Sequence, residues 1–420
     1  MTGPRRRQPR ARQARGRSHV GETYDVVAGP IAHGGHVVAR VPQDPVVEPP
    51  GSVVEPRGSV VEPRGSVVEP PGSVVEPVET PTRVVFVRHA IPGERVRMRI
   101  TEGTDGDRFW RADAVAVLEP SPDRVEPPCP YAGPGRCGGC DFQHVALPAQ
   151  RDLKAAVVRE QLQRLAGLDV PVVVEAVPGD RPEVERGLRW RTRQSYVLTP
   201  QGRAMRKHRS HDTIAIDDCL IAATDAREPA PGVVTESVAG RSFAVAADGF
   251  WQVHPAAPAT LVEAVLDLLT PQAGESVLDL YAGVGLFAAF LAERVGPNGR
   301  VIAIEGDPRA SELSARNVPT AEIAAGDVAR MLASSYLEEV DLVVLDPPRE
   351  GARRPVVEAV AARRPRAVAY VACDPAALAR DVALFAEHGY RLERLRAFDL
   401  FPMTHHVECV ALLTRAADAS

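Results

Sequence analysis

From Gly249 to the C-terminus, short apolar runs alternate with longer stretches in which apolar residues recur at helical spacing. The runs are SVLDL, VIAIE, DLVVLD and AVAYVAC, and the helical stretches include LFAAFLAERV and AALARDVALFAEH. Apolar runs that alternate with helices are typical of a parallel sheet whose strands are joined by crossover helices. The pattern therefore predicts an α/β domain over residues 249–420.

The front of the chain has a different pattern, in which apolar and polar positions alternate over short stretches bounded by glycine and proline. These stretches are YDVVAGPIAHGGHVVARV, TRVVFVRHAIPGERVRMRI and RADAVAVLEPS. They predict the strands of a small antiparallel β-barrel over residues 19–120. Residues 121–248 are expected to form a central α+β domain with a helix from Leu147 to Leu165.

A proline-rich repeat interrupts the predicted barrel. Residues 46–80 contain five seven-residue units, VVEPPGS, VVEPRGS, VVEPRGS, VVEPPGS and VVEPVET. Proline in every unit excludes a helix, and with it a coiled coil. We interpret the repeat as an extended insertion in a loop, where added length costs little, and we assign it no catalytic role.

Composition and charge narrow the class of protein. A chain of 420 residues with 45% hydrophobic and 25% charged residues matches ordinary globular proteins of two or three domains. Residues 1–18 hold seven arginines and no apolar core, so they predict a disordered basic tail and not a signal peptide. No run is apolar enough to span a membrane, and we expect a cytoplasmic protein. Because the net charge is -5, any contact with nucleic acid must be local.

One window of the central segment could make such a contact. Between Arg186 and His211 the chain has seven arginines, one lysine and no acidic residue, together with the aromatic residues Trp190 and Tyr196. Basic side chains interleaved with rings suit single-stranded RNA, whose bases stack on aromatic groups. A solvated surface would give the same composition, so both interpretations stay open.

Four of the six cysteines have the spacing of a metal-ligand set. Cys129, Cys137 and Cys140 lie in CPYAGPGRCGGC, and Cys219 follows far downstream in DDCLIA. Without a secretory signal, metal binding or catalysis is favoured over disulfides. Four thiolates can bind zinc or hold an iron-sulfur cluster, and the spacing leaves both open.

A glycine-rich turn predicts a site for a nucleotide-like ligand. The turn DLYAGVG, residues 279–285, comes directly after an apolar run and before a helical stretch. The next run ends in Glu305, twenty residues past Gly285, where a carboxylate would meet a ribose diol. This pattern indicates an adenosine-containing cofactor without separating a dinucleotide from S-adenosylmethionine.

Several ordered motifs resemble the RNA uracil-5-methyltransferase family over nearly the whole chain. They are GFWQVHP, DLYAGVG, DPPREGA, YVACDPAALARD and FPMTHHVECVALL, and the stretches AHGGHVVARV and FVRHAIPGERV resemble its TRAM domain. The resemblance implies a Rossmann-like class I methyltransferase domain, preceded by a TRAM or OB-like barrel and a cysteine-bearing domain. It also implies S-adenosylmethionine as cofactor, bound by Gln252, Tyr281, Glu305, Asp327 and Asp346. Two positions depart from the family, which commonly has asparagine at His254 and Leu286.

The same resemblance assigns the chemistry. Carbon 5 of uracil is a poor nucleophile, so a thiolate must first add at carbon 6 and generate an enolate. Cys373 fits this nucleophile, and Glu408 fits the general base that later removes the proton from carbon 5. The target base must leave its stack to reach both groups, so an RNA loop is the expected substrate.

The resemblance also favours a 4Fe-4S cluster on Cys129, Cys137, Cys140 and Cys219, and ribosomal over transfer RNA. We expect a monomer without an obligate protein partner. Two alternatives stay open. One is an RNA cytosine-5-methyltransferase, which shares thiolate addition. The other is an RNA-binding protein that keeps the fold without turnover.

Overall fold

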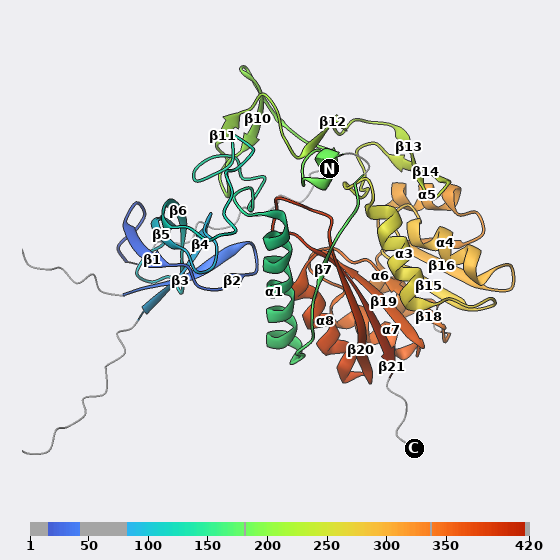
Figure 1. Ribbon diagram of the computed structural model, residues 1–420. Coiled ribbons are helices and arrows are strands. Elements are labelled where there is room, and N and C mark those ends of the chain that lie inside the picture. Colours follow the sequence, from blue (N-terminus) through green and yellow to red (C-terminus); the bar gives the residue numbers. More distant parts are fainter. Residues whose placement is uncertain (1–15, 43–81, 180–181, 337, 416–420) are drawn as a thin grey trace, which may run out of the picture.

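The computed structural model describes residues 16–42, 82–179, 182–336 and 338–415. The structure has an N-terminal sheet, several small sheets and a large mixed sheet, and the long helix α1 lies between the N-terminal sheet and the large sheet (Figure 1). Most of the predicted basic tail and the whole repeat lie outside the described residues. No helix in the described part of the chain is long and apolar enough to cross a membrane.

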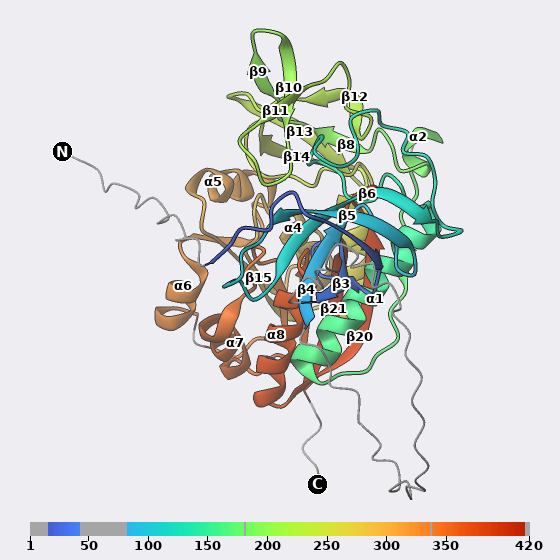
Figure 2. The same ribbon diagram turned by 90° about the vertical axis from the view of Figure 1, so that its left-hand side faces the viewer.

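The N-terminal sheet has six strands in the order β1-β5-β6-β4-β3-β2 and lies in front of the large sheet in the view of Figure 2. Four pairings are antiparallel, but β4 and β6 are parallel. The expectation of an all-antiparallel arrangement is wrong for this pair, because β5 lies on the far side of β6. The strands are β1 (Thr23–Val27), β2 (Ile31–Ala32), β3 (His36–Pro42), β4 (Thr82–Arg88), β5 (Arg95–Glu102) and β6 (Trp110–Glu119).

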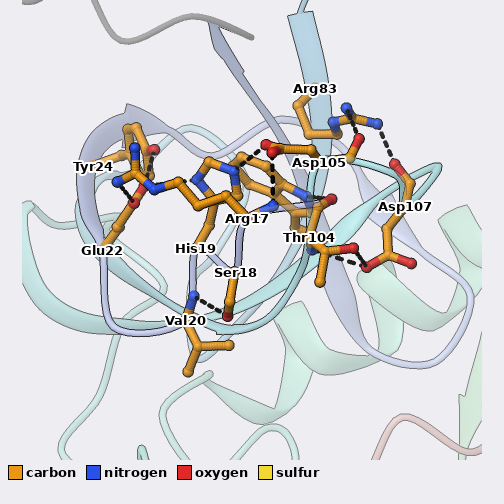
Figure 3. A network of polar contacts seen from close by, with 11 residues as sticks. Arg17, Ser18, His19, Val20, Glu22, Tyr24, Arg83, Thr104, Asp105 and Asp107 are labelled. Carbon is orange, nitrogen blue, oxygen red and sulfur yellow. Dashed lines mark hydrogen bonds and ion pairs between the residues drawn. The ribbon is translucent and has the colours of Figure 1, made fainter. Parts of the chain in front are cut away.

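A polar network holds the start of the described chain against this sheet (Figure 3). The ring of His19 is buried, and its nitrogens lie 2.6 Å from Oδ1 of Asp105 and 2.9 Å from Oε2 of Glu22. Burial alone would lower the pKa of His19, but the two carboxylates raise it above its ordinary value. The ring also stacks on Trp110, so the network joins the entering chain to β6.

The central segment begins with α1 (Leu147–Ala166), as predicted, and the left-handed Gly167 (φ 67°) follows its last turn. The strand β7 (Val174–Ala176), which belongs to the large sheet, and the helix α2 (Pro182–Glu185) come next. Three small sheets follow: β8 with β12, the antiparallel set β9-β10-β11, and the hairpin β13-β14. Their bounds are β8 (Arg191–Arg193), β9 (Val197–Thr199), β10 (Gly202–Arg206), β11 (Thr213–Ala215), β12 (Ala222–Arg227), β13 (Val233–Val238) and β14 (Arg241–Ala246).

The large sheet has eight strands in the order β17-β16-β15-β18-β19-β21-β20-β7. The first five are parallel, β21 is antiparallel to both of its neighbours, and β7 pairs in parallel with β20. The strands are β7 (Val174–Ala176), β15 (Ser276–Leu280), β16 (Arg300–Glu305), β17 (Glu322–Ala325), β18 (Leu342–Leu345), β19 (Ala367–Ala372), β20 (Tyr390–Asp399) and β21 (Glu408–Arg415).

Helices bury both faces of this sheet, which explains why its strands are apolar at consecutive positions. Val277 packs with α3 to α5, whereas its neighbour Leu278 packs with α1, α6, α7 and α8. The helices are α3 (Ala257–Leu269), α4 (Leu286–Val295), α5 (Pro308–Asn317), α6 (Val328–Ser334), α7 (Arg353–Ala362) and α8 (Pro375–Glu387). The α/β prediction is confirmed. In addition, β7 pairs with β20 at the edge of this sheet and α1 packs on one of its faces, although both elements precede residue 249.

Candidate active site

Four of the five residues expected to bind the cofactor lie along one edge of the large sheet. The strands β17, β16, β15 and β18 are parallel neighbours, so their carboxyl ends meet at this edge. Ligands of open α/β sheets bind outside it. The four residues are Asp327 beyond β17, Glu305 at the end of β16, Tyr281 beyond β15 and Asp346 beyond β18.

The glycine turn between β15 and α4 is held by Glu305. The carboxylate of Glu305 accepts hydrogen bonds from the amides of Gly283 (2.8 Å) and Asp307 (2.6 Å). At Gly285, φ is 86° and a Cβ atom would lie 2.7 Å from Oγ of Ser314. Only glycine fits this position without strain. The turn therefore brings main chain close to the place where the sequence predicts a ligand.

Gln252, the fifth cofactor candidate, lies on the loop between β14 and α3 and not on the sheet. Thr192 of β8 donates from its amide (2.8 Å) and its hydroxyl (3.0 Å) to the carbonyl of Val253, which ties this loop to the central segment. His254, where the family commonly has asparagine, is buried with its ring stacked on Trp190. The histidine that replaces the family's asparagine is therefore packed against Trp190 in the protein interior.

Cys373 and Glu408 come together at the ends of adjacent strands. Ala372 of β19 pairs with Cys409 of β21 in the antiparallel register, so the next position on each strand places Cys373 opposite Glu408. Cys373 is partly exposed, whereas Glu408 is buried. Asp346 directly follows β18, the neighbouring strand on the other side of β19. The fold brings the predicted nucleophile, the predicted base and one cofactor candidate to the same sheet edge.

Burial and mutual repulsion disfavour negative charge at these three groups. Burial, and next to it the charge of Glu408, raises the pKa of Cys373 to about 12. Burial and then Asp346 raise the pKa of Glu408 well above its ordinary value. Burial and Glu305 raise the pKa of Asp346 to about 7. Perturbed groups that cluster in this way are typical of functional sites.

Cys373 opens into a cavity of about 160 Å³ that four parts of the chain enclose. The β2-β3 turn contributes His33 and two glycines, the loop before α1 contributes Phe142, and α1 contributes Lys154. The segments around the large sheet contribute Arg349 and the two histidines before Glu408. Nε2 of His33 lies 3.1 Å from Oδ2 of Asp374, the residue that caps α8. The N-terminal sheet is therefore part of the wall around Cys373.

Sequence reasoning missed His33, Lys154 and His405 at this cavity. His33 lies on a separate sheet, and no periodicity signals that its turn reaches Cys373. Lys154 did leave a signal, because it is a charged residue between buried positions of α1. Its side chain is fully buried, and Nζ donates to Oδ1 of Asp399 (2.5 Å) and to the carbonyl of Phe401 (3.0 Å).

The four clustered cysteines of the central segment line a second cavity, of about 140 Å³. Burial is the main cause of a raised pKa at Cys137, Cys140 and Cys219, and the other thiolates add to it. Among the described residues, no group of three or more histidines, cysteines or acids is arranged to hold a metal ion. The four thiols line one cavity, as the sequence predicted. Whether they bind a metal ion or an iron-sulfur cluster stays a prediction.

The structure divides the basic window into two parts. Arg189, Arg191 and Arg193 donate to carbonyls within the protein, and Trp190 is fully buried, so this ring cannot stack on a base as the sequence suggested. The second part lines an open groove of about 700 Å³ beside the cysteine-bearing loop. Its basic and aromatic residues are Tyr196, Arg206, Lys207, His208, Arg209 and His211.

Comparison with known proteins decides the family. The model of the tRNA (uracil-5-)-methyltransferase family matches residues 234–416. A Streptomyces avermitilis protein described as an uncharacterized RNA methyltransferase is 42% identical over 95% of this chain and 99% of its own length. The 23S rRNA (uracil(1939)-C(5))-methyltransferase RlmD of Pseudomonas putida is 32% identical over 79% of this chain and 88% of its own length. This chain belongs to the RNA uracil-5-methyltransferase family.

As an RNA uracil-5-methyltransferase, the protein uses S-adenosylmethionine to methylate RNA. A solved structure agrees in fold: the tRNA (uracil-54, C5)-methyltransferase of Pyrococcus abyssi, in complex with S-adenosyl-L-homocysteine, has a TM-score of 0.61. It is 21% identical and covers 79% of this chain and 95% of its own. The family and the enzyme class predicted from the motifs are confirmed.

Proposed function

We propose that this methyltransferase modifies carbon 5 of a uridine in an RNA loop through a covalent adduct on Cys373. The observation that carries the proposal is the register of β19 and β21, in which Cys373 lies opposite Glu408 at the sheet edge that holds the cofactor candidates. A thiol and a carboxylate so placed can act in turn on the two carbons of one double bond. The partly enclosed cavity beside Cys373 provides room for an unstacked base.

The steps follow from these positions. After the Cys373 thiol has lost its proton to solvent, its sulfur adds to carbon 6 of uracil, and the electrons of the carbon 5–carbon 6 bond form an enolate. Carbon 5 then takes the methyl group from S-adenosylmethionine, which leaves as S-adenosylhomocysteine. The Glu408 carboxylate removes the remaining proton from carbon 5, the double bond reforms and the bond to sulfur breaks.

The cofactor residues have separate roles in this proposal. Glu305 would hold the ribose with the carboxylate that also fixes the glycine turn. Tyr281, Asp327 and Asp346 would surround the rest of the molecule along the sheet edge, and Gln252 would approach from its loop. The charge of Asp346 also adds to burial in raising the pKa of Glu408, and a bound cationic sulfonium would supply a positive charge to this edge.

We favour ribosomal RNA as the substrate. The relative from Pseudomonas putida is named for 23S rRNA, although the family model is named for tRNA. The groove lined by Arg206, Lys207 and Arg209 would hold phosphates, and the N-terminal sheet would act as a TRAM-like RNA contact. Methylation of RNA from cells that lack the enzyme, followed by nucleoside analysis and mapping, tests this proposal. Formation of 5-methylcytidine in place of 5-methyluridine would overturn it.

The four-cysteine cavity fits a 4Fe-4S cluster by its donor set, because four cysteine thiolates are the usual ligands of such clusters. The cluster would cross-link the loop of Cys129 to Cys140 with Cys219, and methylation itself needs no electron transfer. Protein purified without oxygen should contain iron and acid-labile sulfide, and Cys219→Ser should be depleted of both. Stoichiometric zinc without iron would reverse the assignment.

A further inference from the structure

The turn that leads into Glu408, residues 400–407, has no strand or helix of its own and depends on its neighbours for its shape. Its Met403 has φ 66°, a left-handed conformation that is uncommon for a residue with a side chain. Backbone of this kind persists when surrounding contacts fix it. Since the turn ends at the proposed base, whatever fixes it also sets the position of the Glu408 carboxylate.

Lys154 donates to the carbonyl of Phe401 in this turn, and further contacts come from the stretch that follows the last cysteine of the CPYAGPGRCGGC loop. The amides of Asp141 and Phe142 each donate to the carbonyl of Met403 at 3.0 Å. The amide of Met403 in turn donates to Oε1 of Gln150 (2.9 Å). Both main-chain polar groups of Met403 are thus satisfied by the segment from Asp141 into the first turn of α1.

The Asp141 side chain makes the closest contact with the turn. Its Oδ2 lies 2.6 Å from Nδ1 of His405 and accepts the His405 amide at 3.2 Å. The carboxylate is 10% exposed, and Arg88 lies 3.3 Å from its other oxygen. A carboxylate that binds both a ring nitrogen and the main chain of one residue fixes that residue in orientation as well as in position.

We propose that Asp141, acting through His405, is a positioning residue for the proton removal by Glu408. The proposal rests on the proposed role of Glu408 as the base. Because Asp141 directly follows Cys140, it also joins the four-cysteine cavity to the active site through one peptide bond and one side-chain contact. A base must lie within hydrogen-bond reach of its proton, and an error of about 1 Å can slow a step up to a hundredfold.

The test compares His405→Ala with His405→Asn in the full-length protein. Asparagine keeps a side-chain donor for Asp141, and alanine does not. With labelled S-adenosylmethionine and substrate RNA, His405→Ala should release the methylated protein-RNA adduct about tenfold to a hundredfold more slowly. Adduct formation should slow less, although His405 also lines the cavity beside Cys373. His405→Asn should restore most of the release rate. In an Asp141→Ala background, His405→Ala should add nothing further.

Two matched measurements separate a positioning role from general damage. Arg354→Ala breaks a surface ion pair with Glu387 on the catalytic domain and should leave adduct release unchanged. Amide hydrogen exchange at Met403 and His405 should quicken in His405→Ala without RNA, which tests the shape of the turn independently of the base. Unchanged exchange, or equal slowing of adduct formation and release, would overturn the proposal. The two proposals can fail separately. If Glu408→Gln traps no adduct but amide exchange at the turn is still faster in His405→Ala, then Glu408 is not the base, although Asp141 and His405 do fix the turn.

Discussion

At the scale of single residues, the main electrostatic feature of the active site is that burial disfavours the negatively charged forms of its acidic groups. Burial is the main cause that raises the pKa of the Cys373 thiol to about 12, and it also raises the pKa of Glu408 above its ordinary value. A raised pKa means that the reactive, deprotonated form of each group becomes abundant only at a higher pH than usual. We therefore expect alkylation of Cys373, followed by peptide mass spectrometry, to keep accelerating above pH of about 9.5, where an ordinary thiol is almost fully ionised and its rate levels off.

A variant of the neighbouring residue sharpens this prediction. Glu408→Gln removes the charge that is the second cause of the raised pKa, so the alkylation profile should move to lower pH. A profile of the wild-type protein that levels off at or below pH of about 9.5, or one that Glu408→Gln leaves in place, would contradict this description of the site's electrostatics.

At the scale of elements, the basic window shows which part of the site can be predicted from sequence. The sequence shows that the window is basic, but it does not show that only the second part of the window lines an open groove. The burial of Trp190 and the contacts of the first arginines with carbonyl groups depend on tertiary packing. We expect replacement of Arg206, Lys207 and Arg209 by alanine to weaken RNA binding without changing cofactor affinity. The slope of log affinity against log salt should become shallower by about 0.7 for each phosphate that the protein no longer neutralises.

The control for the groove replaces three exposed arginines of the catalytic domain, Arg354, Arg364 and Arg391, which removes the same amount of positive charge. If both triple variants flatten the salt dependence equally, binding follows net charge and the groove has no special role. If neither changes it, the groove is a solvated surface.

At the scale of the whole molecule, periodicity predicted the layers but not how distant segments meet. The apolar runs indicated the α/β sheet and the ends of its strands, and the motifs indicated Cys373 and Glu408. The placement of His33 beside Asp374, the parallel pair β4-β6 and the recruitment of β7 all depend on contacts between separate elements, which leave no periodic signal. The proline-rich repeat, in contrast, is recognisable from the sequence alone as an insertion between strands. Pro42 of β3 and Thr82 of β4, which flank the segment that contains it, pair directly with each other.

This pairing predicts that the repeat can be removed. Deletion of residues 46–78 shortens the connection between two strands that already pair. A shorter connection loses less entropy when its ends are brought together, so the free energy of unfolding should rise by roughly 1.5 kcal/mol. Methylation of RNA should stay within about twofold of the full chain, because the deletion removes none of the residues proposed for the active site. Thermal unfolding and steady-state kinetics check both expectations, and a large rise in KM for RNA would show that the repeat contacts the substrate.

The most direct test of the proposed mechanism separates Cys373 from Glu408 by the step at which each variant fails. Both proteins are incubated with substrate RNA and methyl-labelled S-adenosylmethionine and are then run on a denaturing gel. Glu408→Gln should accumulate a slow-migrating, labelled protein-RNA adduct, because methyl transfer precedes the step that needs the base. Cys373→Ala should give neither adduct nor 5-methyluridine. Turnover by Cys373→Ala, or the absence of adduct from a Glu408→Gln protein that still binds RNA and cofactor, would contradict the mechanism.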